Sequence, residues 1–202
     1  MRGRLAGAPQ AGMCRRMPPP APSEPPSEPL WDWSLRTMQG EEARRALLAL
    51  QDGHGLNGSL MLWAAWCDRA GLCLAEEDAR RIIASVHEMD RYVVRRLREV
   101  RRYAASPRPG YDAPALAALR REVYEAELAA ERLIQARLEA DTLAVCAPRG
   151  GDDETGPRLA RLCARALESP VLLADDLGES GPFALFATLM AHAPALRREE
   201  AG

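Results

Sequence analysis

Asp52, His54 and Asn57 are the first group of side chains in this sequence that could take part in chemistry, and they precede its most apolar run. A histidine titrates near neutral pH, so His54 could act as a general base or a metal ligand. The other interpretation is a turn, in which the Asp and Asn side chains satisfy backbone groups and the histidine is exposed. We favour the turn, because a site needs partners that converge from elsewhere in the fold.

A second group, His87, Glu88 and Asp90, lies within a predicted helix. A zinc protease of the zincin type would need His-Glu-x-x-His, and a di-iron bundle would need repeated Glu-x-x-His pairs. The sequence has neither pattern and holds three histidines, and it contains no nucleophile elbow, P-loop or dinucleotide-binding glycine motif. We therefore expect no metal and no cofactor, and we lean towards a protein that is not an enzyme.

The cysteines and the apolar runs bear on the compartment. The five cysteines are Cys14, Cys67, Cys73, Cys146 and Cys163, and none is spaced as Cys-x-x-Cys from another. Free thiols in a reducing cytoplasm are therefore the default expectation. No run reaches the roughly 18 to 20 apolar residues that a membrane-spanning helix needs. The sequence predicts a cytoplasmic protein that has no membrane partner.

The predicted helix that carries His87 continues into a dense basic run. Its members are Arg91, Arg95, Arg96, Arg98, Arg101 and Arg102. Such a run could follow a phosphate backbone. The rival interpretation is intramolecular, because the next predicted helix carries Glu122, Glu125, Glu127, Glu131, Glu139 and Asp141. An antiparallel hairpin would place the two series side by side, and the net charge of -2 at pH 7 agrees with such pairing. We favour the pairing and do not expect nucleic acid to be the partner.

Helices must position these residues, because the sequence lacks the alternating Val/Ile/Thr runs that a sheet would need. Asn57 is a good N-cap for a helix from Gly58 to about Ala70, which is apolar on every side and should be the buried central helix. The four tryptophans, Trp31, Trp33, Trp63 and Trp66, should pack in the same core. The alternative is that they form the wall of a groove for an apolar ligand or a partner helix.

Two long amphipathic helices are expected next, separated by the Pro- and Gly-containing residues 106–110. The apolar stripe of the first, about 75–104, is Ile82, Val86, Met89, Val93, Leu97, Val100 and Ala104. The stripe of the second, about 112–145, is Leu116, Leu119, Val123, Ala126, Ala130 and Leu133. Together they predict an antiparallel helical hairpin.

The complete prediction is an all-α helical bundle with this long hairpin and a C-terminal helical pair. Residues 1–29 are rich in proline and should be a disordered segment. A helical domain is expected over residues 30–146 and a flexible linker over residues 147–157. Residues 158–196 should form the helical pair docked on the main domain.

The order of sequence blocks resembles a family of small bacterial helical proteins of unknown function. That family opens with Leu-Trp-Asp and an aromatic residue, then has a Leu-Gln-Asp block, a glycine, an asparagine and a very apolar helix. The matching positions are Leu30, Trp31, Asp32, Trp33, Leu50, Gln51, Asp52, Gly55, Asn57, Leu60, Leu62, Trp66, Leu97 and Arg98. The resemblance implies a helical fold and a bacterial, cytoplasmic setting, and it implies no activity.

These observations leave three interpretations of function. The first is a non-catalytic interaction or adaptor protein that binds an unknown protein partner through a helical face and can self-associate. The alternative is a small-molecule binder or enzyme with a pocket beside the tryptophan-rich helix, and the second alternative is nucleic-acid binding through the arginine-rich helix. The candidate ligand- or partner-binding residues are Gln51, Asp52, Asn57, Trp66 and Arg98.

Overall fold

The computed structural model describes residues 26–148, 155–166 and 181–197. Within these residues it has eight α-helices, one π-helical turn and two short strands, so the predicted all-α fold is confirmed. The elements are α1 (Leu30–Gln39), α2 (Glu41–His54), α3 (Gly58–Arg69), β1 (Leu72–Cys73), α4 (Glu76–Met89), η1 (Asp90–Val94), α5 (Arg95–Tyr103), α6 (Ala113–Leu143), β2 (Ala147–Pro148), α7 (Thr155–Ala166) and α8 (Pro182–His192). The predictions for residues 1–25 and for linker residues 149–154 lie outside the described residues.

Helix α3 lies at the centre of the fold, as its apolar sequence predicts. The side chain of Asn57 accepts a hydrogen bond from the backbone N–H of Leu60 at 2.9 Å, which confirms the expected N-cap. Every residue from Gly58 to Cys67 is buried. Helices α1, α2, α6, α7 and α8 all contact α3, which explains why no side of it is polar.

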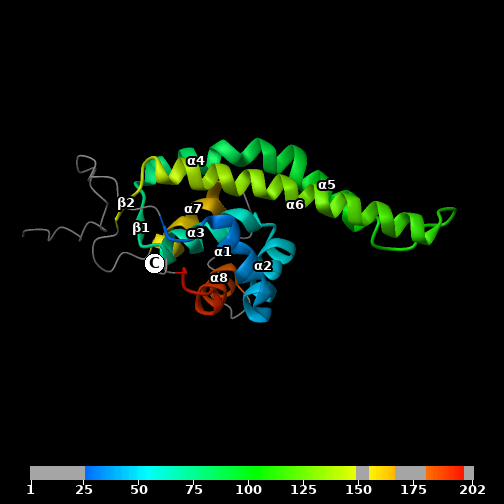
Figure 1. Ribbon diagram of the computed structural model, residues 1–202, viewed down its shortest axis with the longest axis horizontal. Helices are drawn as coiled ribbons and strands as arrows, with labels where there is room; N and C mark the ends of the chain where they lie inside the picture. Colours follow the sequence, from blue (N-terminus) through cyan, green and yellow to red (C-terminus); the bar gives the residue numbers. More distant parts are fainter. Residues whose placement is uncertain (1–25, 149–154, 167–180, 198–202) are drawn as a thin grey trace, which may run out of the picture.

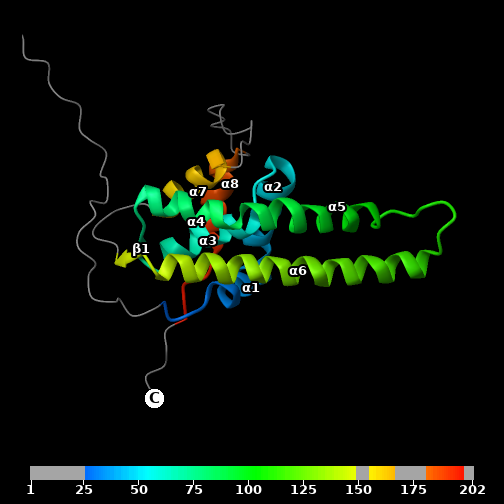
Figure 2. The ribbon, with the colours of Figure 1, turned by 90° about the horizontal axis from the view of Figure 1, so that it is seen from above.

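The long hairpin has α4, η1 and α5 on one side and α6 on the other. The first three elements continue one another, and α6 runs antiparallel beside them (Figure 2). Helix α6 starts where the side chain of Asp112 accepts a hydrogen bond from Ala115 N at 2.9 Å and Pro114 occupies the first turn. Figure 1 shows that one half of the hairpin covers the body formed by α1, α2, α3, α7 and α8, whereas the other half extends beyond it.

The C-terminal helices complete the same core. Helix α7 packs on α3, and α8 packs on α2. The backbone N–H of Gly156 donates to Asp68 Oδ1 at 3.1 Å, and a Cβ at position 156 would lie 2.9 Å from the Cβ of Asp68. Helix α7 therefore approaches α3 too closely for any residue larger than glycine at position 156. Beyond α8, the backbone oxygen of Pro194 accepts a hydrogen bond from Trp33 Nε1 at 2.9 Å.

Two predicted boundaries differ from the structure. Glu28, which we placed in the disordered segment, is buried, and its carboxylate pairs with Arg36 at 2.5 Å. Its backbone oxygen also accepts a hydrogen bond from Trp66 Nε1 at 3.0 Å. Residues 147 and 148, which we placed in the linker, form strand β2 and pair with β1. Both corrections depend on partners that are distant in the sequence, so local composition gives no sign of them.

The buried face of α6 also differs from the predicted stripe. Leu133 is exposed, and the buried residues are Glu127, Ala130, Ile134, Gln135, Leu138 and Thr142. Helix α6 contacts α1, α3, α4 and α5, so the body fixes which face is buried as much as the periodicity does.

The cysteines agree with the sequence prediction in part. Cys67 and Cys163 are free thiols, and burial raises the pKa of both. Cys73, in contrast, is disulfide-bonded. A disulfide requires proximity in the fold, which sequence spacing alone does not reveal.

Candidate functional site

The five predicted site residues do not converge on one cavity. Asn57 is the buried N-cap of α3, and Trp66 is fully buried with its indole N–H bonded to the backbone oxygen of Glu28. Gln51 lies against the start of α3, where its Oε1 would be 2.7 Å from a Cβ at position 58. Asp52 is exposed on α2, and its carboxylate pairs with Arg102 of α5. The fifth residue, Arg98, is buried between α5 and α6.

Three of the four tryptophans lie in the core, as predicted, whereas Trp31 is only partly buried and its ring centroid lies 5.7 Å from the guanidinium of Arg132. Trp33, Trp63 and Trp66 have no exposed surface. The indole N–H of Trp63 donates to Thr142 Oγ1 at 2.8 Å, so all three buried indoles have a hydrogen-bond acceptor. Buried indoles with satisfied N–H groups are typical of a packed interior. Among the described residues, these three indoles are part of the packed core around α3.

A buried group of ion pairs joins α5 to α6. Arg98 Nε lies 2.9 Å from Glu127 Oε1, and Arg98 NH2 lies 2.7 Å from Glu131 Oε1. Arg101 Nε reaches the second oxygen of Glu127 at 2.5 Å. We refer to these four residues as the clasp. The clasp thus joins arginines of the basic run to glutamates of the next helix, as the sequence predicts.

The clasp perturbs its two carboxylates in opposite directions. Burial raises the pKa of Glu127, but hydrogen bonds from Arg101 and Arg98 outweigh burial and leave that pKa below its ordinary value. Burial also raises the pKa of Glu131, and here the charge of Arg98 is too weak a counterweight, so the pKa stays above its ordinary value. The hydrogen bond to Glu127 raises the pKa of Arg101. The clasp thus contains one firmly ionised carboxylate and one that protonates more readily.

The rest of the basic run is also largely paired within the chain. Arg95 contacts the buried Asp90 at 2.7 Å, five residues back across the π-helical turn. Arg96 pairs with Glu99 at 2.9 Å, and Arg102 pairs with Asp52. Arg91 lies over the ring of Tyr92, 5.4 Å from its centroid. Five of the six arginines in the run therefore have a carboxylate partner, so the run is not a free basic track.

Beyond the clasp, the two helices lose their cover. We define residues 99–126 as the distal hairpin, and within them only Ala104 is buried. Large side chains are exposed there, namely Val100, Tyr103, Tyr111, Leu119 and Tyr124. Tyr92, just before the clasp, is exposed as well, so all four tyrosines of the chain are exposed on the hairpin.

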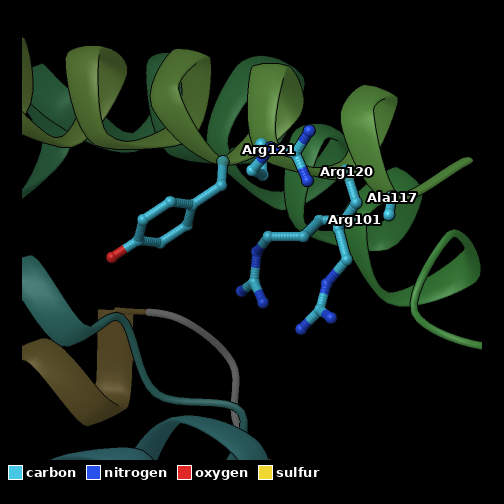
Figure 3. Close-up of a pocket in the computed structure, with 5 residues that line it drawn as sticks. Arg101, Ala117, Arg120 and Arg121 are labelled. Atoms are coloured by element: carbon cyan, nitrogen blue, oxygen red, sulfur yellow. The ribbon is translucent and has the colours of Figure 1, made fainter. Parts of the chain in front are cut away.

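A hollow of about 320 Å³ lies on the distal hairpin, lined by Arg101, Ala117, Arg120, Arg121 and Tyr124. Figure 3 shows Arg101 and Arg120 with their guanidinium groups extended to the same side of the hairpin. Arg101 also lies 5.8 Å from the centroid of the Tyr124 ring. Arg120 and Arg121 are exposed, and neither has an ion pair within the part of the chain that the structure describes.

Sequence reasoning missed this hollow because it depends on how α6 is rotated against α5. Residues 117, 120, 121 and 124 are spaced by three and four, so they share a face of α6. That spacing is a usable signal, but it becomes meaningful only when Arg101 is known to lie opposite.

Two further properties concern the described residues alone. None of the described helices is long and apolar enough to cross a membrane. No three His, Cys, Asp or Glu side chains in the described ranges are grouped so that they could hold a metal ion.

Comparison with known proteins gives a family. Residues 29–138 match the model of a family described as "Protein of unknown function (DUF2390)", and this match covers more than half of the chain. The chain belongs to this family. The resemblance drawn from the order of the sequence blocks, to a family of unknown function, is thereby confirmed.

The region matched by the DUF2390 model runs from the residue before α1 to Leu138 within α6. It includes the clasp and every residue that lines the hollow, and it stops before α7 and α8. No curated protein and no solved structure matches the chain.

Proposed function

We propose that this member of the DUF2390 family is a non-catalytic interaction protein of the bacterial cytoplasm that binds a protein partner through its distal hairpin. The observation that carries the proposal is the concentration of exposed aromatic and aliphatic side chains beyond the clasp. Tyr103 and Tyr111 have exposed fractions of 59% and 71%, and Leu119 has one of 47%. Single exposed apolar residues are ordinary, but a cluster on a projecting element is typical of binding surfaces.

The residue types support a protein partner. Tyrosine and arginine are enriched among the residues that dominate binding energy at protein interfaces. The distal hairpin presents three tyrosines, with Arg120 and Arg121 nearby. A tyrosine offers a large contact area with few rotatable bonds, so ordering it on binding costs little conformational entropy.

The clasp fixes the base of the distal hairpin to the rest of the fold. The buried ion pairs and the packed core hold its base, so Val100, Tyr103, Leu119 and Tyr124 are presented on two helices, and Tyr111 lies in the turn that joins them. A surface held in one conformation loses less entropy when a partner binds. Figure 1 shows that the end of the hairpin extends away from the body, where a partner can reach it from several directions.

Both alternative interpretations have less support. A ligand pocket beside α3 would require space that Trp33, Trp63 and Trp66 occupy. Nucleic-acid binding through the arginine run would require free guanidinium groups, and five of its six arginines have carboxylate partners within the chain.

Photocrosslinking in the native host tests the proposal. A photoreactive benzoylphenylalanine would replace Tyr111 at the end of the hairpin, and the matched control would carry it in place of Phe183, an exposed aromatic residue on α8. We expect a discrete protein adduct from position 111 and none of the same mass from position 183. A band that contains a second copy of this chain would identify self-association as the interaction. The same adducts from both positions, or none from position 111, would overturn the proposal.

A further inference from the structure

The hollow on the distal hairpin combines a small volume with concentrated positive charge. Its volume of about 320 Å³ is at the lower end of the range of ligand pockets, about 300 to 1,000 Å³, so it can hold one or two side chains. Three of its five lining residues are arginines, and no carboxylate is among them. Its shape and charge therefore favour a small anionic group.

The clasp balances the charge of Arg101 but not the charges of Arg120 and Arg121. Arg101 is held from one side by Glu127 through two contacts of 2.5 and 3.2 Å, which fixes its guanidinium without removing it from the hollow. Arg120 and Arg121 add two charges that have no ion pair among the described residues. A planar guanidinium can donate two parallel hydrogen bonds to one carboxylate, so this arrangement suits a carboxylate well.

The surroundings distinguish a protein from a nucleic acid. Apolar surface borders the arginines, from Ala117 and the ring of Tyr124 in the wall. Glu122 and Glu125 are exposed on the same helix and would repel a phosphate backbone that continued past the hollow. A segment that alternates acidic and apolar side chains matches both features, because its carboxylates would meet the arginines only at the hollow.

We propose that the hollow anchors an acidic, amphipathic segment of the protein partner. One Glu or Asp carboxylate of that segment accepts hydrogen bonds from Arg101 and Arg120, while Arg121 adds to the positive potential. An apolar side chain of the same segment packs on Tyr124 and Ala117. This inference rests on the proposed function, since it specifies the chemistry of the partner that the distal hairpin binds.

Fluorescence anisotropy with the full chain tests the anchor. The probes are a fluorescein-labelled 20-residue helical peptide of Glu and Leu, the same peptide with every Glu replaced by Gln, and a 20-nucleotide single-stranded DNA. The test variant is Arg120→Ala/Arg121→Ala. The control is Arg44→Ala/Arg45→Ala, which removes two adjacent exposed arginines from α2 and so changes the net charge equally.

We expect the Glu peptide to bind and the Gln peptide to bind at least about tenfold more weakly, as lost hydrogen bonds to charged groups imply. The test variant should lose about tenfold in affinity for the Glu peptide, and the control variant should match the wild type. Absence of Glu-peptide binding at millimolar concentration, equal binding of the two peptides, or equal losses in both variants would overturn the anchor. Tighter binding of the DNA, lost in the test variant alone, would also overturn it and would assign the hollow to phosphate.

The two proposals fail separately. A partner crosslinked at position 111 whose yield is unchanged by Arg120→Ala/Arg121→Ala would reject the anchor and retain the interaction surface. Peptide binding that depends on Arg120 and Arg121, with no adduct from position 111, would reject the interaction surface in the native host and retain a carboxylate-binding hollow.

Discussion

The two halves of the hairpin are built from the same pair of helices, but they are buried to very different extents. On the body side of the clasp, Ile82 and Val86 of α4 and Ile134 and Leu138 of α6 are all buried. Beyond it, Val100 of α5 and Leu119 of α6, which both belong to the predicted apolar stripes, are almost half exposed. Two helices paired with each other leave part of their apolar faces uncovered, and only a third element completes the burial.

The clasp lies at the boundary between these two halves. Arg98 and Glu127 are its buried members, and the next buried residue towards the end of the hairpin is Ala104. Burying charges there is acceptable only because each has hydrogen-bonded partners of opposite sign. The half of the hairpin beside the body is therefore stabilised by apolar packing. The distal hairpin depends instead on the ion pairs at its base and on the pairing of its two helices.

The largest expected difference between the two regions comes from the core. Trp66→Ala should lower the free energy of unfolding by about 3 to 5 kcal/mol, because it removes a fully buried indole and leaves a cavity. Tyr111→Ala on the distal hairpin should change it by less than about 0.5 kcal/mol, since that side chain is exposed. Urea unfolding followed by circular dichroism measures both. Similar losses for the two variants would mean that the distal hairpin is part of the cooperative core.

A smaller effect should come from the clasp. Glu127→Ala leaves Arg98 and Arg101 without their shared partner, and removing one member of a buried ion pair costs about 3 kcal/mol. The matched variant Glu122→Ala removes an exposed glutamate from the same helix and should change stability by less than about 0.5 kcal/mol. Equal effects of the two variants in urea unfolding would show that the clasp does not hold the two helices together.

The smallest effect should be a dependence of stability on pH, with opposite signs for the two clasp glutamates. The pKa of Glu127 is below the ordinary value of 4.5, so its stabilisation is complete above pH 4.5 and is lost as the pH falls further. The pKa of Glu131 is above 4.5, so its contribution is complete below pH 4.5 and is lost as the pH rises through the folded-state pKa.

Glutamine variants separate these two contributions. The stability difference between wild type and Glu127→Gln should shrink as the pH is lowered below 4.5, because protonation removes what the substitution removes. The difference between wild type and Glu131→Gln should instead shift in favour of the wild type as the pH falls from 7 to 4.5. Urea unfolding at a series of pH values gives both slopes, and slopes of the same sign would contradict the assigned directions.

Sequence patterns predict the parts of this fold that are determined by residues close together in the sequence. Asn57 was identified as an N-cap, and the apolar run after it as the central helix, because capping and periodicity act within a few residues. The pairing of Arg98 with glutamates of the next helix followed from an antiparallel hairpin and is present in the structure.

The remaining features depend on contacts between residues that are distant in the sequence, so neighbouring residues do not predict them. Leu133 continued a correct periodicity but is exposed, since contacts with α1 and α3 as well as α4 fix the rotation of α6. Glu28 is buried by Arg36 and by the backbone of Arg197, which lies 169 residues away. The hollow depends on both effects, because it requires a particular rotation of α6 and a residue supplied by another helix.

The hydrogen bond from Trp33 to the backbone of Pro194 has a consequence for biosynthesis. The donor and the acceptor are 161 residues apart, so a ribosome must translate all of these residues before the indole N–H of Trp33 can find its acceptor. Until then, the indole N–H of Trp33 in α1 lacks the acceptor that it has in the folded core. The region matched by the family model ends at residue 138, so that region alone does not supply the acceptor. Completion of the core therefore requires that residue 194 has been synthesised.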